Sequence, residues 1–371
     1  MSLFLGLMSG TSLDGIDAVA VRWAHDDAPA LQVLGHVHQG FNGGLREQLL
    51  LLNQPAGNEL EVAAQAAIAL AHEYAGAIDA LLLHAGITRD QVRAVGAHGQ
   101  TVRHCPQASG GGFSIQLLNG ALLAERCGID VVCDLRSRDL AAGGQGAPLV
   151  PAFHADRFAA RGEARAVLNL GGIANVTLLH PDGRVGGFDS GPANVLLDAW
   201  ANEQQGVSYD ADGRWAASGH VDDALLQRLL ADPYFQRPPP KSTGRDLFQL
   251  SWLTTQLAAL GHALAPADVQ ATLAELTACS VADALQRHLP DANGLWVCGG
   301  GALNSHLLTR LAVRLPKLRV QTTDALGLPS QQVEAVAFAW LAREFVERRS
   351  ANRPEVTGAH GPRVLGCLYP A

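Results

Sequence analysis

The sequence predicts an α/β protein built from two domains, and three observations support this prediction. A chain of 371 residues is long for one domain and comfortable for two. A strand, a turn of small residues and a second strand follow one another within residues 3–23, and the same order returns within 166–179. Helical patterns follow both segments. We expect a first domain at 1–150 plus 331–371 and a second at 151–330.

Short apolar runs alternate with long helical patterns in the first half of the chain. Apolar runs predict strands at 3–8, 16–23, 31–39, 92–97 and 129–133. Helices are predicted at 44–53 and 59–85, and the second of these is very rich in Ala and Leu. This half therefore supplies a sheet with helices to cover it.

The second half repeats this composition with one additional connector. Strands are predicted at 166–170, 176–179, 185–188 and 295–298. Helices are predicted at 247–260, 266–288, 304–315 and 331–349. Three consecutive prolines at 238–240 exclude a helix or a central strand, so they mark an exposed connector.

The composition excludes several classes of protein. A hydrophobic fraction of 48% excludes disorder, and a net charge of -8 with only two lysines, Lys241 and Lys317, argues against nucleic-acid binding. The first residues lack the basic region of a signal peptide, and we find no uninterrupted apolar run of membrane-spanning length. The six cysteines have no zinc-ligand spacing and predict free thiols. We therefore expect a cytoplasmic protein with no membrane partner.

A turn rich in glycine and hydroxyl groups, the first loop, lies between the first two strands. Its backbone N–H groups are suited to a phosphate, because glycine allows close approach and Ser and Thr add donors. It is not a Walker loop, which runs into a helix and ends in Gly-Lys-Ser/Thr. A plain hairpin turn is the alternative. The candidate residues are Gly10, Thr11, Ser12, Leu13, Asp14, Gly15, Ile16 and Asp17.

Two further glycine turns follow, the second loop at 171–175 and the third loop at 299–304. The second loop alone is compatible with an ordinary hairpin, and the third is not a Rossmann fingerprint, because Asn304 stands where the final glycine should be. Two facing glycine hairpins are suited to a polyphosphate between two domains, and the third loop to a base or ribose. The candidate residues are Gly171, Gly172, Asn175, Gly299, Gly300, Gly301 and Asn304.

The order hairpin, hairpin, strand-to-helix turn resembles the actin-like ATPase and sugar-kinase superfamily. Five segments narrow the resemblance: LMSGTSLDGID at 7–17, GQT at 99–101, CDLRSRD at 133–139, GGQGAPL at 143–149 and FDSGPAN at 188–194. Together they resemble the anhydro-N-acetylmuramic acid kinase family over essentially the whole chain. Ser190 and Ala193 stand where Thr and Gly are frequent, and neither change affects the carboxylate beside them.

The resemblance implies a fold and a reaction. The fold would be two RNase H-like domains flanking a nucleotide and sugar cleft, and we expect them to close, since kinases exclude water from the γ-phosphate. Members of the family use ATP and water to open the anhydro bridge of 1,6-anhydro-N-acetylmuramic acid and phosphorylate O6. The products are N-acetylmuramate 6-phosphate and ADP, within peptidoglycan recycling. A homodimer would fit the family.

Asp189 is the candidate catalytic base. Opening an internal acetal needs a base that activates water at the anomeric carbon, and inverting glycosidases add a second carboxylate as the acid. Here the phosphoryl group can capture the leaving oxygen, so one base suffices. Asp189 follows an apolar strand, and we expect Ser190-Gly191-Pro192 to form a turn that presents it. Without the resemblance, a turn or helix-cap residue would be the commoner interpretation.

Two arginines are further candidates. Arg136 and Arg138 follow the strand at 129–133, and guanidinium groups suit either the lactyl carboxylate of the sugar or a transferring phosphate. We assign Arg136 to catalysis and Arg138 to the substrate. Ion pairs with Asp134 or Asp139 are the alternative.

Four other groups complete the set of candidates. His98, Gln100 and Thr101 are suited to hydrogen-bond the sugar, although a lone histidine is usually structural. Asp14 and Asp17 are candidates to hold Mg²⁺ through water, since this ion uses one or two carboxylates plus phosphates. Glu334, in the first turn of the last helix, is a second-line catalytic candidate that the helix dipole favours regardless of function. The polar block at 241–246 has no role that the sequence reveals.

Three rival functions remain open. An ordinary sugar kinase would use Asp189 to deprotonate a hydroxyl group instead of water. A non-enzymatic ATP-dependent clamp, like actin or heat-shock relatives, would need a partner-binding region, and no such appendage is visible. A metal-independent glycosidase does not explain the three glycine loops.

Overall fold

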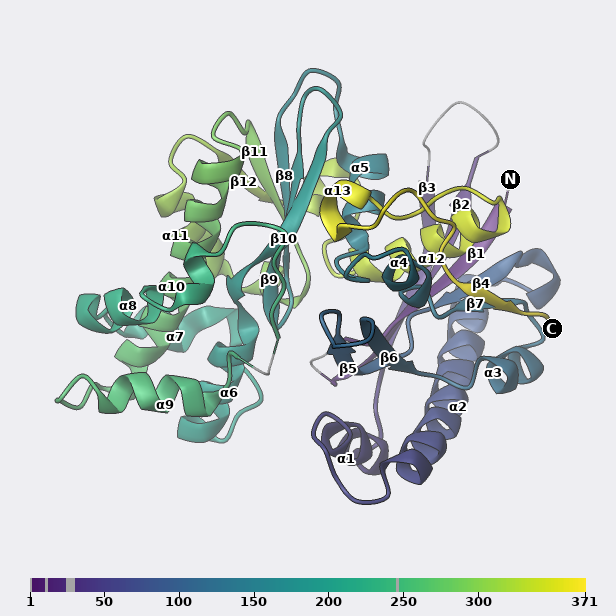
Figure 1. Ribbon diagram of the computed structural model, residues 1–371, viewed down its shortest axis with the longest axis horizontal. Helices are drawn as coiled ribbons and strands as arrows, with labels where there is room; N and C mark the ends of the chain where they lie inside the picture. Colours follow the sequence, from purple (N-terminus) through teal and green to yellow (C-terminus); the bar gives the residue numbers. More distant parts are fainter. Residues whose placement is uncertain (1, 11–12, 25–30, 245–246) are drawn as a thin grey trace. The chain divides into compact units, whose positions relative to one another are not determined.

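The computed structural model describes residues 2–10, 13–24, 31–244 and 247–371, and it divides into two compact units (Figure 1). Unit 1 comprises Met1–Phe153 and Gln332–Ala371, and unit 2 comprises His154–Gln331. The sequence analysis placed these limits at 150 and 331. Each unit has its own sheet and its own hydrophobic core.

The sheet of unit 1 has the strand order β13-β7-β4-β1-β2-β3. Strands β1, β2 and β3 form an antiparallel meander, and β4 and β7 continue the sheet in parallel beyond β1. The strands of the unit are β1 (Ser2–Met8), β2 (Gly15–Trp23), β3 (Leu31–Gly40), β4 (Ala94–Ala97), β7 (Val131–Cys133) and β13 (Cys367–Tyr369), with β5 (Gln100–Cys105) and β6 (Phe113–Leu117) as a separate hairpin. The helices are α1 (Gly43–Leu51), α2 (Glu59–Ala85), α3 (Gly120–Cys127), α4 (Ser137–Ala141), α12 (Val333–Val346) and α13 (Pro354–Thr357), with a 3₁₀ turn η1 (Arg89–Gln91). Helix α5 (Val150–Phe158) contains the boundary between the two units, which falls after Phe153.

The sheet of unit 2 has the order β10-β9-β8-β11-β12 and repeats the same pattern, an antiparallel meander followed by two parallel strands. The strands are β8 (Arg165–Leu170), β9 (Ile173–Leu179), β10 (Val185–Pro192), β11 (Gly294–Cys298) and β12 (Arg319–Thr322). The helices are α6 (Asn194–Gln205), α7 (Arg214–Ser218), α8 (Asp223–Leu230), α9 (Leu250–Ala258), α10 (Pro266–His288) and α11 (Ser305–Arg314). The 3₁₀ turns are η2 (Ala211–Gly213), η3 (Pro233–Gln236), η4 (Gly300–Leu303) and η5 (Thr323–Leu326).

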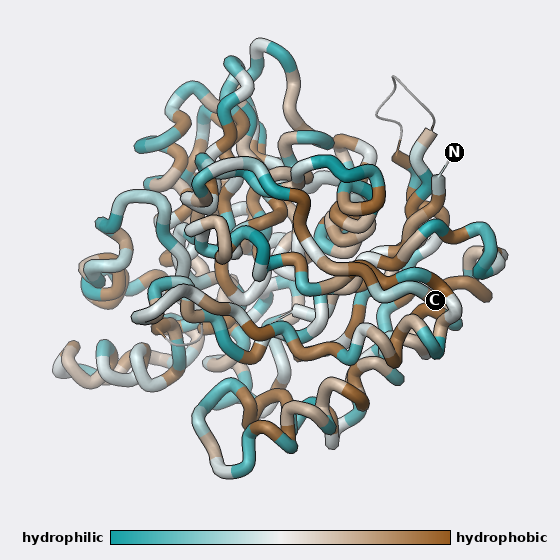
Figure 2. The backbone as a smooth tube through the Cα atoms, turned by 45° about the vertical axis from the view of Figure 1, so that its right-hand side comes forward, coloured by the Kyte–Doolittle hydropathy of each residue, from teal (hydrophilic) through white to brown (hydrophobic). Residues whose placement is uncertain are grey.

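The two faces of the unit 1 sheet are covered by different helices. Alternate residues of a strand point to opposite faces, and Leu3, Leu5 and Leu7 of β1 join the core that contains the buried residues of α2. Gly6 points to the other face, where α12 crosses β1 and β4. Figure 2 shows the corresponding hydropathy, with brown segments in strands and helices and teal at most surface turns.

A pair of glycines lets α12 approach this sheet closely. Gly6 of β1 and Gly96 of β4 are register partners. A Cβ atom at Gly6 would overlap the backbone oxygen of Ala335, and one at Gly96 would overlap that of Phe338. Backbone atoms cannot rotate away as a side chain can, so only glycine fits at these two positions.

Unit 2 has the same two-faced arrangement with different residues. Leu168 and Leu170 of β8 join the core that contains α10, a helix buried on almost every side. Val167 points to the opposite face, and its register partner on β11 is Trp296. Large side chains therefore occupy the face on which unit 1 has glycine.

One helix of the described residues, α2, is long and apolar enough to cross a membrane when judged by length and composition alone. Half of its most apolar window is buried, and Leu70, Ile78 and Leu81 pack in the core of unit 1. A core helix has the same composition as a membrane span, so this is weak evidence for a membrane. The expectation that the protein has no membrane partner stays a prediction.

Most of the expected elements are present, and the differences lie at their ends. The predicted helices at 59–85 and 266–288 are confirmed at both ends as α2 and α10. Pro266 occupies the first turn of α10, where its missing N–H group costs nothing. The last long helix is shorter than the predicted 331–349, since α12 covers Val333–Val346.

Candidate functional site

The first loop connects β1 and β2 in unit 1 and is attached to the core of that unit. The Ser9 hydroxyl donates to the Gly99 carbonyl at 2.9 Å and shares a hydrogen bond with the hydroxyl of the buried Tyr74. The Leu13 N–H donates to the Gly10 carbonyl at 3.3 Å, which closes the turn. The candidate residues Thr11 and Ser12 lie outside the described residues.

The β5 strand holds two candidates close to this loop. The Gln100 side-chain N–H donates to the Gly10 carbonyl at 3.0 Å. Its Oε1 atom is buried and has no hydrogen-bond partner in the described part of the chain, so Gln100 retains an acceptor. The Thr101 hydroxyl accepts a hydrogen bond from Gln116 at 3.0 Å. The first loop and the start of β5 therefore belong to one hydrogen-bonded region.

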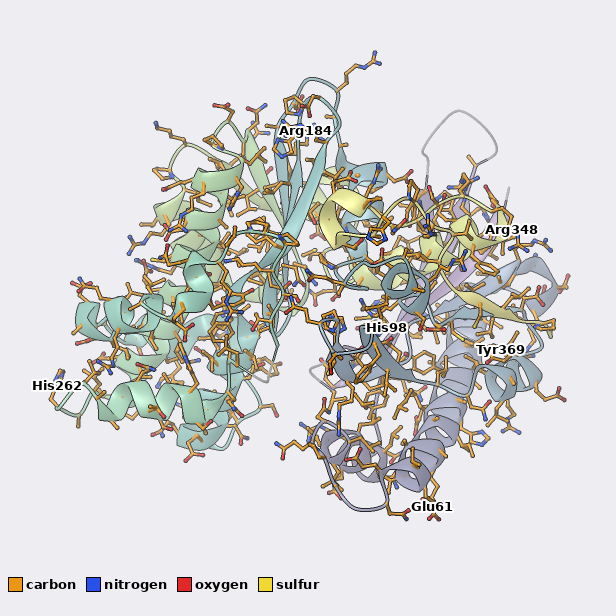
Figure 3. The ribbon with its side chains drawn as sticks, viewed as in Figure 1. Glu61, His98, Arg184, His262, Arg348 and Tyr369 are labelled. Carbon is orange, nitrogen blue, oxygen red and sulfur yellow. The ribbon has the colours of Figure 1, made fainter. Side chains whose placement is uncertain are left out.

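His98 connects this region to Arg136 (His98 is labelled in Figure 3). An Arg136 Nη2–H donates to His98 Nε2 at 3.0 Å, so the proton on the neutral ring is on Nδ1 and is donated to the Ser9 carbonyl at 3.0 Å. Burial, with the Arg136 charge as a smaller cause, lowers the pKa of His98 to about 3. Both ring nitrogens are thus bonded within unit 1. This arrangement favours a role in orienting Arg136 over contact with the sugar.

The two arginines of the segment CDLRSRD at 133–139 lie in different surroundings. Arg136 Nη1 donates to the Gly146 carbonyl at 2.8 Å, whereas Arg138 is exposed on α4. The buried Asp139 accepts from Asn352 at 2.7 Å and Thr357 at 2.8 Å. Asp139 therefore fastens the motif to the C-terminal segment.

The two carboxylates proposed for Mg²⁺ lie in different environments. Asp14 is exposed in the first loop. Asp17 is on β2, and its Oδ1 atom contacts His36 Nε2 at 2.9 Å and His38 Nδ1 at 3.1 Å. No group of three His, Cys, Asp or Glu side chains that could bind a metal occurs among the described residues. Mg²⁺ keeps several of its waters and is usually bound by one or two carboxylates together with substrate phosphates. Asp14 and Asp17 therefore fit a magnesium ion that the phosphates hold and that these carboxylates contact through water.

The second and third loops lie at the carboxyl ends of two neighbouring strands of unit 2. Strands β8 and β11 are parallel, so the loops that follow them leave the sheet at the same end of the strands. Gly299 has φ of +83°, and a Cβ atom there would overlap Asn169 Oδ1 and crowd the Leu170 carbonyl at 2.9 Å. At Gly300, by contrast, the nearest atom to a Cβ would be 3.9 Å away. The backbone of the third loop is therefore fixed by the end of β8 and open at Gly300.

Two candidates of these loops have structural partners that the sequence did not reveal. Strand β9 begins at Ile173, so Asn175 belongs to the strand and the turn is only Gly171-Gly172. This corrects the expected turn at 171–175; the strand pairing of Ile173 with Pro192 extends β9. Asn304 is the N-cap of α11, and its Oδ1 accepts from Leu307 N at 2.9 Å.

Asp189 lies within β10, and the expected turn after it is wrong. The strand continues to Pro192, with an irregularity in pairing between Asp189 and Gly191. Because β10 is an edge strand, Pro192 is tolerated there without the loss of a ladder hydrogen bond. Asp189 is 6% exposed. A sequence pattern of Asp-Ser-Gly-Pro is typical of a turn, and here strand pairing overrides it.

Four groups fix the orientation of Asp189. Asn175 is its register partner on β9, and the Asn175 amide donates to Oδ1. The Thr243 N–H donates to Oδ2 at 2.9 Å. On the main chain, the Asp189 N–H donates to the Lys241 carbonyl at 3.2 Å and its carbonyl accepts from the Tyr234 hydroxyl at 2.7 Å. A buried carboxylate held in this way is preorganised as a hydrogen-bond acceptor or base.

The sequence analysis named Asn175 only as a nucleotide candidate, and it missed the other residues that hold Asp189. Tyr234 and Thr243 carry no motif, and only their position beside the triple proline drew attention to this part of the chain. Lys241 had one usable signal, since it is one of two lysines in the chain. Glu334 lies in the first turn of α12, as predicted.

Two solved structures resemble this chain in fold, although their sequences differ strongly from it. The activator of the 2-hydroxyisocaproyl-CoA dehydratase from Clostridium difficile matches with a TM-score of 0.50 and 13% identity, covering 93% of this chain and 96% of that one. Component A of the Acidaminococcus fermentans (R)-2-hydroxyglutaryl-CoA dehydratase matches with a TM-score of 0.51 and 12% identity, covering 91% and 96%. The chain therefore shares the α/β fold of these two proteins.

Sequence comparison identifies the family within this class. The family described as "Anhydro-N-acetylmuramic acid kinase" matches residues 2–371. Proteins of that name from Bordetella petrii and Cupriavidus pinatubonensis are 58% and 55% identical to the chain; the matches cover 100% and 99% of this chain and 96% and 98% of those proteins. A protein of the same name from Nitrosomonas europaea is 51% identical, and the match covers 99% of this chain and 99% of that protein. The chain belongs to the anhydro-N-acetylmuramic acid kinase family.

Proposed function

We propose that this protein uses ATP and water to convert 1,6-anhydro-N-acetylmuramic acid to N-acetylmuramate 6-phosphate, a step of peptidoglycan recycling. Asp189 removes a proton from water as the water attacks the anomeric carbon. The bond from that carbon to the bridging oxygen breaks, and this oxygen accepts the γ-phosphoryl group of ATP. ADP leaves with the electrons of the broken phosphoanhydride bond.

The geometry of Asp189 carries this proposal. Both carboxylate oxygens accept hydrogen bonds, from Asn175 and from the Thr243 N–H, so the side chain does not rotate freely. An ionised carboxylate is an acceptor and can take a proton from water. A general base is effective when it is held at hydrogen-bond distance from its target, and a fixed carboxylate meets that condition.

The other candidates have supporting roles in the proposal. The backbones of the first and second loops bind the phosphates of ATP, and the open backbone at Gly300 accepts the nucleoside. Arg136, oriented by His98, stabilises the transferring phosphoryl group. Gln100, Thr101 and Arg138 bind the sugar, which is supported by Gln100 Oε1, an atom without a hydrogen-bond partner among the described residues.

Mg²⁺ is the proposed cofactor, bound mainly by the ATP phosphates and through water by Asp14 or Asp17. It would neutralise charge on the phosphates. The protein groups bind and orient the nucleotide, and Glu334 at the start of α12 is a further candidate to orient the hydrated ion.

We also propose a cytoplasmic homodimer. All six cysteines are free thiols, which supports a reducing compartment. The dimer rests on the resemblance to the family.

The test is a kinase assay with anhydro-N-acetylmuramic acid, ATP and Mg²⁺ in ¹⁸O-labelled water, with wild-type protein and Asp189→Asn. We expect one label at the anomeric carbon and loss of both ring opening and phosphorylation in the variant, by about 10³-fold. Asp182→Asn, an exposed carboxylate paired with Arg184 on the β9–β10 turn, is the matched control and should retain wild-type rates.

Two results would contradict the proposal. Phosphorylation of open N-acetylmuramic acid but not of the anhydro sugar would show an ordinary sugar kinase. Hydrolysis of ATP without sugar, at a rate near that of the coupled reaction, would show that opening and transfer are not linked.

A further inference from the structure

Lys241 occupies an unusual position for a lysine in this chain. It follows the three prolines at 238–240 and is one of only two lysines, the other being the exposed Lys317. A lysine in a protein that uses ATP is ordinarily expected to bind a phosphate. The contacts of Lys241 show a different use of its charge.

The main chain at Lys241 is part of the structure that holds Asp189. The Lys241 carbonyl accepts the Asp189 N–H, and two residues later the Thr243 N–H donates to the Asp189 carboxylate. The segment thus lies beside the edge strand β10, on the side where no further strand of the described residues pairs with it. The hydrogen bond at Lys241 fixes the backbone of Asp189, and the one at Thr243 fixes its side chain.

The ammonium group of Lys241 is directed to groups of unit 2. It donates to the Tyr234 carbonyl at 3.3 Å and lies 4.7 Å from the centre of the Tyr234 ring. It also lies 5.7 Å from the centre of the Phe188 ring, the residue immediately before Asp189. Aromatic faces attract a cation at such distances. The Tyr234 hydroxyl in turn donates to the Asp189 carbonyl.

The charges around Lys241 include Asp189. Burial and the positive charges of Arg287 and Arg237 lower the pKa of Lys241, while the negative charge of Asp189 opposes them. The same cluster affects His288, whose pKa is lowered by burial and by the charges of Lys241 and Arg287. Asp189 and Lys241 therefore interact electrostatically in a region that also contains two arginines and a histidine.

We propose that Lys241 is a positioning residue for Asp189 and does not bind the phosphates of ATP. Its backbone fixes the Asp189 main chain, and its ammonium group, held on the ring of Tyr234, keeps a positive charge near the carboxylate without neutralising it by direct contact. The positive charge favours the ionised form of the base. This inference rests on the proposed role of Asp189.

The kinetic test compares Lys241→Met, Lys241→Arg and the matched control Lys317→Met. We expect Lys241→Met to lower kcat about tenfold or more, with the KM for ATP unchanged within about twofold. The acid limb of its pH–rate profile should move to higher pH, because the carboxylate loses a stabilising positive charge. Lys241→Arg retains the charge and should recover the profile, and Lys317→Met should match the wild type.

A second measurement does not depend on catalysis. An amine-reactive acylating reagent can label only two lysine side chains, and mass spectrometry distinguishes them. Asp189→Asn removes the charge that raises the pKa of Lys241, so Lys241 should become more reactive relative to Lys317 at a fixed pH near 8. Wild-type protein and Asp182→Asn give the reference ratio.

The outcomes separate this inference from the proposed function. If the anhydro sugar is not phosphorylated but the labelling ratio changes in Asp189→Asn, the proposed function fails and the coupling of the two residues stands. An unchanged labelling ratio contradicts the inference. So does a raised KM for ATP with normal kcat in Lys241→Met, since that result is expected of a phosphate ligand. Failure of Lys241→Arg to restore the acid limb would also overturn it.

Discussion

The two units each place a carboxylate in a matching row of their sheets, but on different strands of that row and in different surroundings. In each unit, three register partners, one from each strand of the meander, form a row next to the turn between the first two strands. In unit 1 the carboxylate is on β2, the middle strand of the meander, where it is partly exposed and bonded to two imidazoles. In unit 2 it is on the edge strand β10, buried and bonded to amides. The rows are Met8–Asp17–His38 and Asn169–Asn175–Asp189.

These different surroundings are the reason why we propose Asp189, and not Asp17, as the base. An edge strand has one side free of strand neighbours, and unit 2 uses that side for the segment that contains Lys241 and Thr243. Asp17 has β1 and β3 on its two sides. A repeated fold thus offers the same row twice, and the strand that carries the carboxylate and the surrounding loop decide its chemistry.

The largest expected effect is on activity. Asp189→Asn should lower kcat by about 10³-fold, because the amide cannot accept the proton from water. Asp17→Asn, at the matching row of unit 1, should lower kcat by less than about tenfold, since it is at most a water-mediated partner of Mg²⁺. Steady-state assays at saturating Mg²⁺ measure both. An equal loss of kcat in the two variants would contradict the proposal that only Asp189 acts as the base.

The next effect is on the stability of unit 1. Gly96→Ala places a Cβ atom on the backbone oxygen of Phe338, and we expect a loss of about 3 kcal/mol or failure to fold. Gly186→Ala is the matched control on β10, where the new atom would meet only the Leu178 side chain at 3.2 Å. Denaturant unfolding should show a loss below about 1 kcal/mol for this control. If Gly96→Ala and Gly186→Ala lose a similar free energy of unfolding, the backbone of α12 does not lie as close to Gly96 as described.

A smaller effect concerns pH, because the described residues include one buried histidine in each unit, His98 and His154. Burial lowers the pKa of His98 and of His154 from 6.5 to about 3, with the Arg136 charge contributing at His98. Between these values the unfolded chain binds protons that the folded chain does not. Acid therefore favours unfolding, by up to about 1.4 kcal/mol per pH unit for each histidine.

The variant His154→Gln isolates the contribution of unit 2. Glutamine does not titrate and can keep a hydrogen bond to Thr177, the partner of His154 at 2.8 Å. Urea unfolding at pH 7 and pH 5 should show a smaller loss of stability in acid for the variant than for the wild type. An equal loss would mean that His154 is protonated in the folded protein.

The smallest effect tests whether Asn304 is a helix cap or a nucleotide ligand. Asn304→Ala should cost about 1 kcal/mol, as expected for an N-cap, and Asn304→Asp should restore the stability. The matching change in unit 1 is Asn119→Ala, which removes the cap of α3. If Asn304→Asp is stable but the KM for ATP rises markedly, Asn304 contacts the nucleotide as well.

The sequence predicted the repeated strand pattern, the two long helices and the family, because period, length and ordered motifs are local properties of the chain. It did not predict the bonds around Asp189. Asn175 is 14 residues away and Thr243 is 54 residues away along the chain. The contact with Thr243 depends on how a connector folds back on an edge strand, and no local pattern encodes that path. The error at Ser190-Gly191-Pro192 has the same origin, since pairing with β9 overrode a turn signal.

The division of the chain has a consequence for protein synthesis. Unit 2 is one continuous stretch, whereas unit 1 is made of two stretches with unit 2 inserted between them. The face of β1 and β4 with Gly6 and Gly96 receives α12 from the second stretch, and β13 pairs with β7 only when the final residues are present. On the ribosome, the unit that begins first is therefore completed last, and its half-built sheet must remain soluble while unit 2 is translated.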